Sequence, residues 1–158
     1  MNPRQLEQEL ELPNIQASLV AYRDAAQKSK WYIRFFVSGP DARYNPGVAV
    51  VSSPRVQKLL DAFSKAYKKM ELLEAKDFTG KFSEDFLSRG EVSDDLAMTV
   101  SSEVSRFLFW SSKKIRLHLL VSSKTNTFSK CFCLEDVKIV IDRLSSAENL
   151  ATKLMSQL

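Results

Sequence analysis

Apolar residues recur every three or four positions in several segments of the chain, and this spacing predicts amphipathic helices. The clearest helix starts at Ser53, an N-cap residue that Pro54 follows, and its apolar stripe continues to Leu73. The first dozen residues are expected to form a short helix or to fray. Further helices with weaker patterns are predicted over 14–28, 83–90, 93–108 and from 135 nearly to the C-terminus.

Four other segments are rich in aromatic and β-branched residues and are predicted as strands. The loop GPDARYNPG separates the first two, and the turn KTNT separates the last two. Each pair is therefore expected to form a hairpin. The strands are WYIRFFVS at 31–38, VAVVSS at 48–53, KKIRLHLLVSS at 113–123 and FSKCFCL at 128–134.

The order helix, strand, strand, helix occurs twice, at about 14–75 and 93–157, with an insertion at about 76–92. When Val37 is aligned with Val121, the apolar positions of the two first strands coincide. We expect an α+β fold in a single domain of residues 1–158. Two αββα-like halves would build one four-stranded antiparallel sheet, with the helices packed on one face.

Alternation along the strands predicts which side chains face the helices. One row in each first strand is wholly apolar and must be buried, because a slip by one residue would bury Arg34 and His118. In the second strands, Val48 and Val50, and likewise Cys131 and Cys133, are assigned to the buried side. The face that remains carries Tyr32, Arg34, Phe36, Ala49, Val51, Arg116, His118, Leu120, Lys130 and Phe132.

This face of aromatic and basic residues has three interpretations. It can bind nucleic acid, with Tyr32, Phe36 and Phe132 stacking on bases. Phosphates or base edges would then meet Arg34, Arg116, Lys130 and His118. It can instead form an interface with a second copy or a partner protein. Finally, the insertion or the N-terminal segment can fold back and cover it, the insertion with Phe78, Phe82, Phe86 and Leu87.

A second set of basic residues lies on one face of the helix that starts at Ser53: Arg55, Lys58, Lys65, Lys68 and Lys69. Such a run is usually a solvent-exposed face, but it can also follow a phosphate backbone. Arg43 and Tyr44, in the loop GPDARYNPG, could reach the same ligand.

Composition is consistent with nucleic-acid binding but does not require it. The chain has 158 residues, a net charge of +4 and a pI near 9.1. It contains no apolar run long enough for a transmembrane helix and no signal-peptide core at its N-terminus. A protein of the cytoplasm or nucleus, without a membrane partner, is expected. Two cysteines separated by one residue, with a single histidine in the chain, make a zinc site or a disulfide improbable.

Candidate catalytic groups do not converge in the sequence. His118 has no acid or nucleophile that the sequence places beside it. The acidic pairs Asp94–Asp95 and Glu135–Asp136 both stand where a helix is expected to start, so capping explains them. We therefore expect a nucleic-acid-binding protein that is not an enzyme and needs no cofactor or metal, with RNA or a single strand favoured. The alternative is a protein-interaction or assembly subunit that uses the same face.

Overall fold

The computed structural model describes residues 4–36, 48–122 and 127–158, apart from the side chain of Phe107. It contains two four-stranded antiparallel sheets, each with its strands in chain order. The first sheet and the helix after it consist of β1 (Gln5–Leu10), β2 (Gln16–Arg23), β3 (Ser29–Phe36), β4 (Val48–Ser52) and α1 (Ser53–Ala75). The second sheet and its helices consist of β5 (Gly80–Leu87), β6 (Leu96–Phe107), β7 (Trp110–Ser122), β8 (Thr127–Phe132), α2 (Leu134–Ser145) and α3 (Ala147–Met155).

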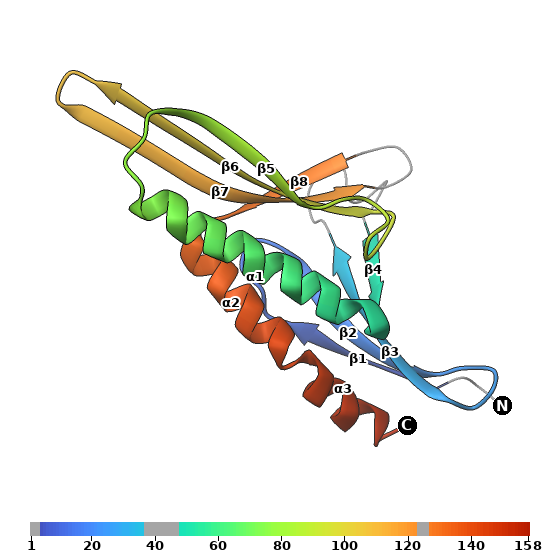
Figure 1. The fold of residues 1–158 in the computed structure, drawn as a ribbon. Helices are drawn as coiled ribbons and strands as arrows, with labels where there is room; N and C mark the ends of the chain where they lie inside the picture. Colours follow the sequence, from blue (N-terminus) through green and yellow to red (C-terminus); the bar gives the residue numbers. More distant parts are fainter. Residues whose placement is uncertain (1–3, 37–47, 123–126) are drawn as a thin grey trace.

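The helices form a layer between the two sheets (Figure 1). α1 contacts β3 and β4 of the first sheet and β5, β6 and β7 of the second. α2 packs beside α1 and reaches β7 and β8, whereas α3 packs on β2 and β3. Each sheet therefore has an inner face on the helices and an outer face that points away from them.

One hydrophobic core joins the inner faces of both sheets to the helices. Ile33 and Phe35 enter it from β3, and Leu117 and Leu119 enter it from β7. All four are completely buried. The prediction that these rows face the helices is confirmed for every described member, and Trp31, although only partly buried, packs against the core.

The helix predicted to start at Ser53 is confirmed as α1, but its N-cap residue is Ser52 and not the predicted Ser53. The last predicted helix is also present, but it divides at Ser146 into α2 and α3. Other helix predictions are wrong. Residues 14–28 contain β2, 83–90 fall in β5 and the turn after it, and 93–108 contain β6. The first dozen residues hold β1.

The failure at 93–108 has a local cause, because its apolar residues fit two periods. Leu96, Val100 and Val104 suit a helix, but Leu96, Met98 and Val100 alternate as in a strand. The rest of the segment is rich in serine, threonine and valine, which disfavour a helix interior. Pairing with β5 on one side and β7 on the other then selects the strand.

The predicted single sheet of two αββα-like halves is also wrong. β3–β4 and β7–β8 are the third and fourth strands of two separate sheets. Each half of the chain contains four strands followed by helix. The first two strands of each half were not predicted as strands. The α+β class is correct, and the strand–strand–helix order at 29–75 and 110–145 does recur.

The faces assigned to the second strands were reversed. Ala49 and Val51 are fully buried in the core, while Val50 is 44% exposed. In β8, Phe132 is buried at 1% exposure and Cys131 is exposed. In β8 the bulkier apolar residue takes the core position, and the exposed thiol loses little by facing outward.

Candidate functional site

The outer face of the first sheet is closed by contacts among its own side chains. On β3, Arg34 donates a hydrogen bond to the Glu7 carboxylate on β1, and its guanidinium lies 4.5 Å from the centre of the Phe36 ring. Tyr32 packs against Tyr22, with 5.7 Å between ring centres. Val20, which lies outside the main core cluster, is nevertheless fully buried. Three predicted ligand-binding residues on this face, Tyr32, Arg34 and Phe36, therefore already have partners within the chain.

The electrostatics of this cluster favour its present contacts. A hydrogen bond with Ser18, and then the nearby Arg34 guanidinium, lower the pKa of the Glu7 carboxyl. The carboxylate is thus held charged opposite Arg34. A phosphate that approached Arg34 would have to displace an anion that is already in place.

The outer face of the second sheet is more open, and one row of side chains on β7 dominates it. Alternation along β7 turns every second residue outward, and from Ile115 onward the intervening positions are buried. Lys114 and Arg116 are exposed, and His118 is half-buried. From the hairpin end inward, the row consists of Trp110, Ser112, Lys114, Arg116, His118 and Leu120. We call it the β7 row.

Charges beside the β7 row are mixed, with basic groups in excess. Lys81 on β5 and Lys114 on β7 flank Glu103 on β6 in one line of the register. Within the described residues, neither lysine makes an ion pair. Asp85 accepts a hydrogen bond from Thr99 at 2.7 Å. Arg116 donates to the carbonyl of Ile115 and lowers the pKa of Glu135 by its charge, after hydrogen bonds that lower it more.

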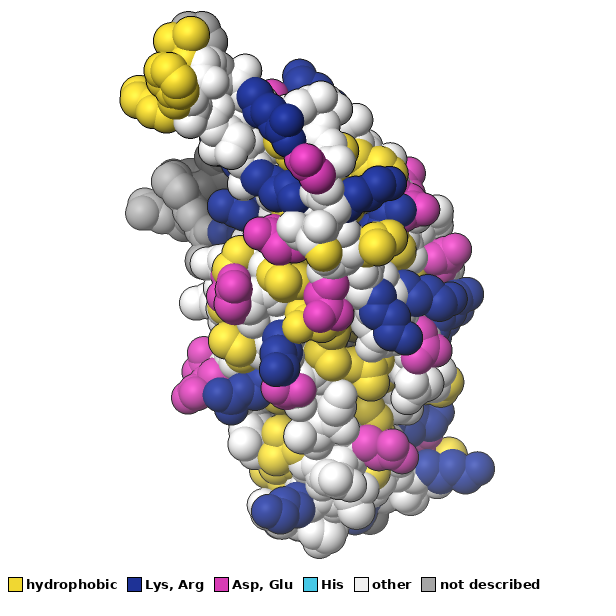
Figure 2. Space-filling model, turned by 60° about the vertical axis from the view of Figure 1, so that its left-hand side comes forward, with side chains coloured by type: hydrophobic (Ala, Val, Ile, Leu, Met, Phe, Trp, Pro, Cys, Tyr) yellow, Lys and Arg dark blue, Asp and Glu magenta, His cyan; other side chains and the backbone are white. Residues whose placement is uncertain are grey.

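The β7 row ends in an exposed apolar hairpin tip. Leu108, Phe109 and Trp110 are 85%, 98% and 78% exposed. Figures 1 and 2 show the β6–β7 hairpin extending beyond the other strands, with an apolar tip and basic side chains on the body behind it. Burying these side chains within the chain would be favourable, so their exposure suggests a contact with something else.

Backbone geometry makes this tip more unusual. Leu108 has φ of 52°, and it is the first residue of a two-residue loop between Phe107 and Trp110. Glycine is the usual residue at such a position, because a side chain there costs roughly 1–2 kcal/mol. Neither burial nor turn geometry explains a leucine here.

Trp110 was not among the predicted site residues, although the run FLFW before SSKK signals an apolar turn.

His118 is held by hydrogen bonds from both neighbouring strands. Its Nε2 lies 2.6 Å from Ser101 Oγ on β6, and its Nδ1 lies 3.2 Å from Cys131 Sγ on β8. Cys131 is the direct cross-strand partner of His118. The sequence places neither residue beside the histidine, since β6 was predicted as a helix and Cys131 was assigned to the buried side.

Several predicted site residues do not belong to the β7 row. Phe132 is buried in the core and cannot stack on a base, and Lys130 falls on the inner side of edge strand β8, half-buried. The prediction that these two lie on the outer face is wrong. Arg43 lies outside the described residues. On α1, Lys58 and Lys65 are exposed, and the Lys69 amine lies 4.7 Å from the Phe82 ring centre.

The insertion at 76–92 does not cover an outer face as one interpretation proposed. It forms β5, the edge strand of the second sheet. Phe78, Phe82 and Phe86 are partly buried against the core. The Lys113 amine donates to the carbonyls of Glu74 and Lys76, at the end of α1, and lies over the Phe78 ring. These contacts tie the insertion to the inner side.

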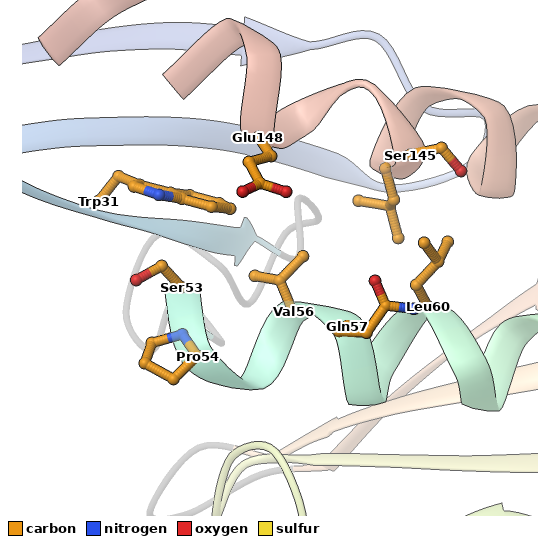
Figure 3. A pocket seen from close by; sticks show the side chains of 9 residues that line it. Trp31, Ser53, Pro54, Val56, Gln57, Leu60, Ser145 and Glu148 are labelled. Atoms are coloured by element: carbon orange, nitrogen blue, oxygen red, sulfur yellow. The ribbon is translucent and has the colours of Figure 1, made fainter. Parts of the chain in front are cut away.

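A hollow of about 390 Å³ lies between the start of α1, β3 and the junction of α2 with α3 (Figure 3). The Trp31 ring extends toward the Glu148 carboxylate on one side of the hollow, and Val56 and Leu60 of α1 lie on the opposite side. Glu148 is its single ionisable group. A lone carboxylate without a nucleophile or a second acid or base gives no reaction mechanism.

Among the described residues, no cluster of three or more histidine, cysteine or acidic side chains could hold a metal ion. None of the helices in this part of the chain is long and apolar enough to cross a membrane. Comparison with known protein families, with curated proteins and with solved structures finds no match. The function has to be inferred from the geometry.

Proposed function

We propose that this protein binds nucleic acid without catalysing a reaction, and that it prefers RNA or a single strand to a duplex. The observation that carries the proposal is the β7 row, in which an exposed tryptophan stands in line with exposed basic side chains. Tryptophan offers a stacking surface for an unpaired base, while lysine and arginine meet phosphates.

The spacing along the row supports a strand that follows β7. Outward residues on a strand are about 6.6 Å apart, so Lys114 and Arg116 would meet neighbouring points along an extended chain. Trp110 lies two steps beyond Lys114, at the exposed end of the hairpin. Stacking on Trp110 requires a base that is already unpaired, which favours a single strand over a duplex.

The test is binding of a labelled single strand of mixed sequence at about 50 and 200 mM salt. If Lys81, Lys114 and Arg116 each neutralise one phosphate, the logarithm of affinity falls with the logarithm of salt with a slope near −2. Lys114→Ala should make that slope shallower by about 0.7. Trp110→Ser should cost about 1–3 kcal/mol of binding at every salt concentration, with an unchanged slope.

Lys58→Ala on α1 is the matched control, because Lys58 is an exposed lysine away from the β7 row. Its slope should equal that of the wild type. If Lys58→Ala changes the slope and Lys114→Ala does not, the strand runs along α1 and the β7 row is not the site. Absence of binding at the lower salt concentration would overturn nucleic-acid binding altogether.

A second candidate function, a protein-interaction or assembly subunit, is favoured by the hairpin tip. Leu108 and Phe109 are apolar, nearly fully exposed and presented on a convex turn that could enter an apolar pocket of a partner protein or a second copy. Light scattering of the wild type and of Phe109→Ser tests self-association. A multimeric mass that becomes monomeric in the variant would support it. A monomeric wild type would exclude self-association through the tip.

A further inference from the structure

The contacts of His118 place a thiol, a base and an orienting hydroxyl in one line across three strands. Cys131 Sγ lies 3.2 Å from His118 Nδ1, and Ser101 Oγ lies 2.6 Å from His118 Nε2. A nucleophile within reach of a base that a third group orients is the general arrangement of activated nucleophiles. β7 pairs with β6 on one side and with the edge strand β8 on the other, so the register fixes all three groups.

The two contacts determine how a proton can move. A neutral imidazole has one nitrogen that donates and one that accepts. When Nε2–H donates to Ser101 Oγ, Nδ1 is free to accept the proton of the Cys131 thiol. Transfer of that proton leaves a thiolate beside an imidazolium, and Ser101 still accepts from Nε2–H. The thiolate is the reactive form of cysteine.

Cys131 is also accessible, in contrast to the other cysteine. It is exposed on the outer face of the second sheet. Cys133 is half-buried at the N-cap of α2, and burial raises the pKa of its thiol, with the nearby Asp136 and Glu135 adding to the effect. The chain therefore carries its own control, a second thiol two residues away without a base.

Charged groups around Cys131 come from several elements. Arg116 lies on the same face of β7 as His118, and Asp85 lies on β5, three strands from Cys131 in the same register line. The Asn14 amide donates both to the Cys131 carbonyl and to the Asp136 carboxylate, at 3.0 and 3.1 Å. These bonds hold the Cys131 backbone and engage the Asp136 carboxylate, which leaves the side of the thiol that faces solvent open.

We propose that Cys131 is a site of covalent modification by low-molecular-mass disulfides through thiol–disulfide exchange, with His118 as its proton acceptor and donor. The Cys131 thiolate attacks one sulfur of R–S–S–R, so a Cys131 Sγ–S bond forms and the original S–S bond breaks. Cys131 sulfur is oxidised, and the departing RS⁻ is reduced. It takes the proton held on His118 and leaves as RSH.

Modification would also act on the proposed function. An adduct on Cys131 stands beside His118 in the β7 row, where it would obstruct a bound strand. This consequence rests on the proposed nucleic-acid binding, whereas the reactivity of Cys131 does not. The two can therefore fail separately.

The experiment treats the folded protein at pH 7 with excess oxidised glutathione and follows adduct formation by intact mass. We expect Cys133→Ser to acquire one adduct at the wild-type rate, and Cys131→Ser to react at least about 10-fold more slowly. His118→Gln keeps a polar side chain without a base and should slow the reaction at Cys131 about 10-fold or more. Ser101→Ala should slow it less, and circular dichroism verifies that each variant is folded.

Equal rates for Cys131→Ser and Cys133→Ser, or an unchanged rate in His118→Gln, would overturn the proposal. A second measurement compares single-strand binding by the modified and the reduced protein. If the reduced protein binds and the adduct weakens binding about 10-fold or more, both proposals are supported. If the adduct forms selectively but neither form binds, the modification site stands and the proposed function fails.

Discussion

Two phenylalanines with opposite environments give the most direct test of how the second sheet is arranged. Phe132 is 1% exposed and lies in the core, whereas Phe109 is 98% exposed at the hairpin tip. The same substitution to alanine should therefore cost much stability at Phe132 and almost none at Phe109. The comparison also tests the direction in which the side chains of β8 point.

The magnitude follows from the buried area. A core phenylalanine removes roughly 150–250 Å² from water, which at about 25 cal/mol per Å² corresponds to about 4–6 kcal/mol. Alanine keeps one carbon of the side chain, and measured Phe→Ala costs in cores are about 3–5 kcal/mol. For a chain of 158 residues, this lowers Tm by about 6–20 °C. Phe109→Ala should change the free energy of unfolding by less than about 0.5 kcal/mol.

Thermal and denaturant unfolding of both variants measure the difference. A cost below about 1 kcal/mol for Phe132→Ala, or equal costs for the two variants, would show that β8 is turned the other way. Phe132 would then be free to stack on a base after all. The stability measurement must come before any binding assay, because a loss of binding by Phe132→Ala would otherwise be mistaken for a lost contact.

Two further substitutions test features of the outer faces. Leu108→Gly should stabilise the protein by about 0.5–1 kcal/mol, since it relieves a left-handed backbone cost of about 1–2 kcal/mol and adds about 0.5–1 kcal/mol of unfolded-state entropy. Lower stability than the wild type would exclude strain at this turn. Glu7→Gln should destabilise the protein at pH 7 by about 0.2–1 kcal/mol, the range for partly exposed pairs. Because folding lowers the Glu7 pKa, its contribution is present above the unfolded value near 4.3 and is lost as pH falls through the folded value. The difference between variant and wild type should therefore vanish by about pH 2, and a difference that persists there would rule out the carboxylate as its source.

Elements with one strong local pattern could be predicted from the sequence. The stripe from Val56 to Leu73 fits a helix and nothing else, and α1 follows it. The apolar rows of β3 and β7 leave only one side that can be buried without burying Arg34 or His118. The direction of His118, away from the helices, was correct for that reason.

Elements that depend on distant partners could not be predicted in this way. β2 and β6 are flanked by strands on both sides, so pairing supplies much of their stability. Residues 16–23 contain alanine, leucine and glutamine, which suit a helix in isolation. In β8, the prediction followed the usual burial of cysteine, but Phe132 has the larger apolar area and is the residue that is buried.

Errors in the fold determined which site residues were missed. With 93–108 predicted as a helix, Phe109 and Trp110 appeared to follow a helix end instead of forming the turn of a hairpin. For the same reason, Ser101 could not be predicted to lie beside His118. The residues of β7 that face outward could be predicted from the sequence. The strands that pair with β7 on either side could be identified only in the structure.

The two outer faces show how similar strand arrangements can carry different chemistry. Arg34 on β3 and His118 on β7 are outward residues of the third strand in their sheets. Arg34 is neutralised by an acid and covered by an aromatic ring, so a ligand would have to break contacts before it gained any. Among the described residues, the partners of His118 are a hydroxyl and a thiol, and the thiol can transfer its proton to the imidazole. A ligand or a reactive disulfide should therefore meet the second sheet first, and variants of Arg34 should reduce stability more than binding.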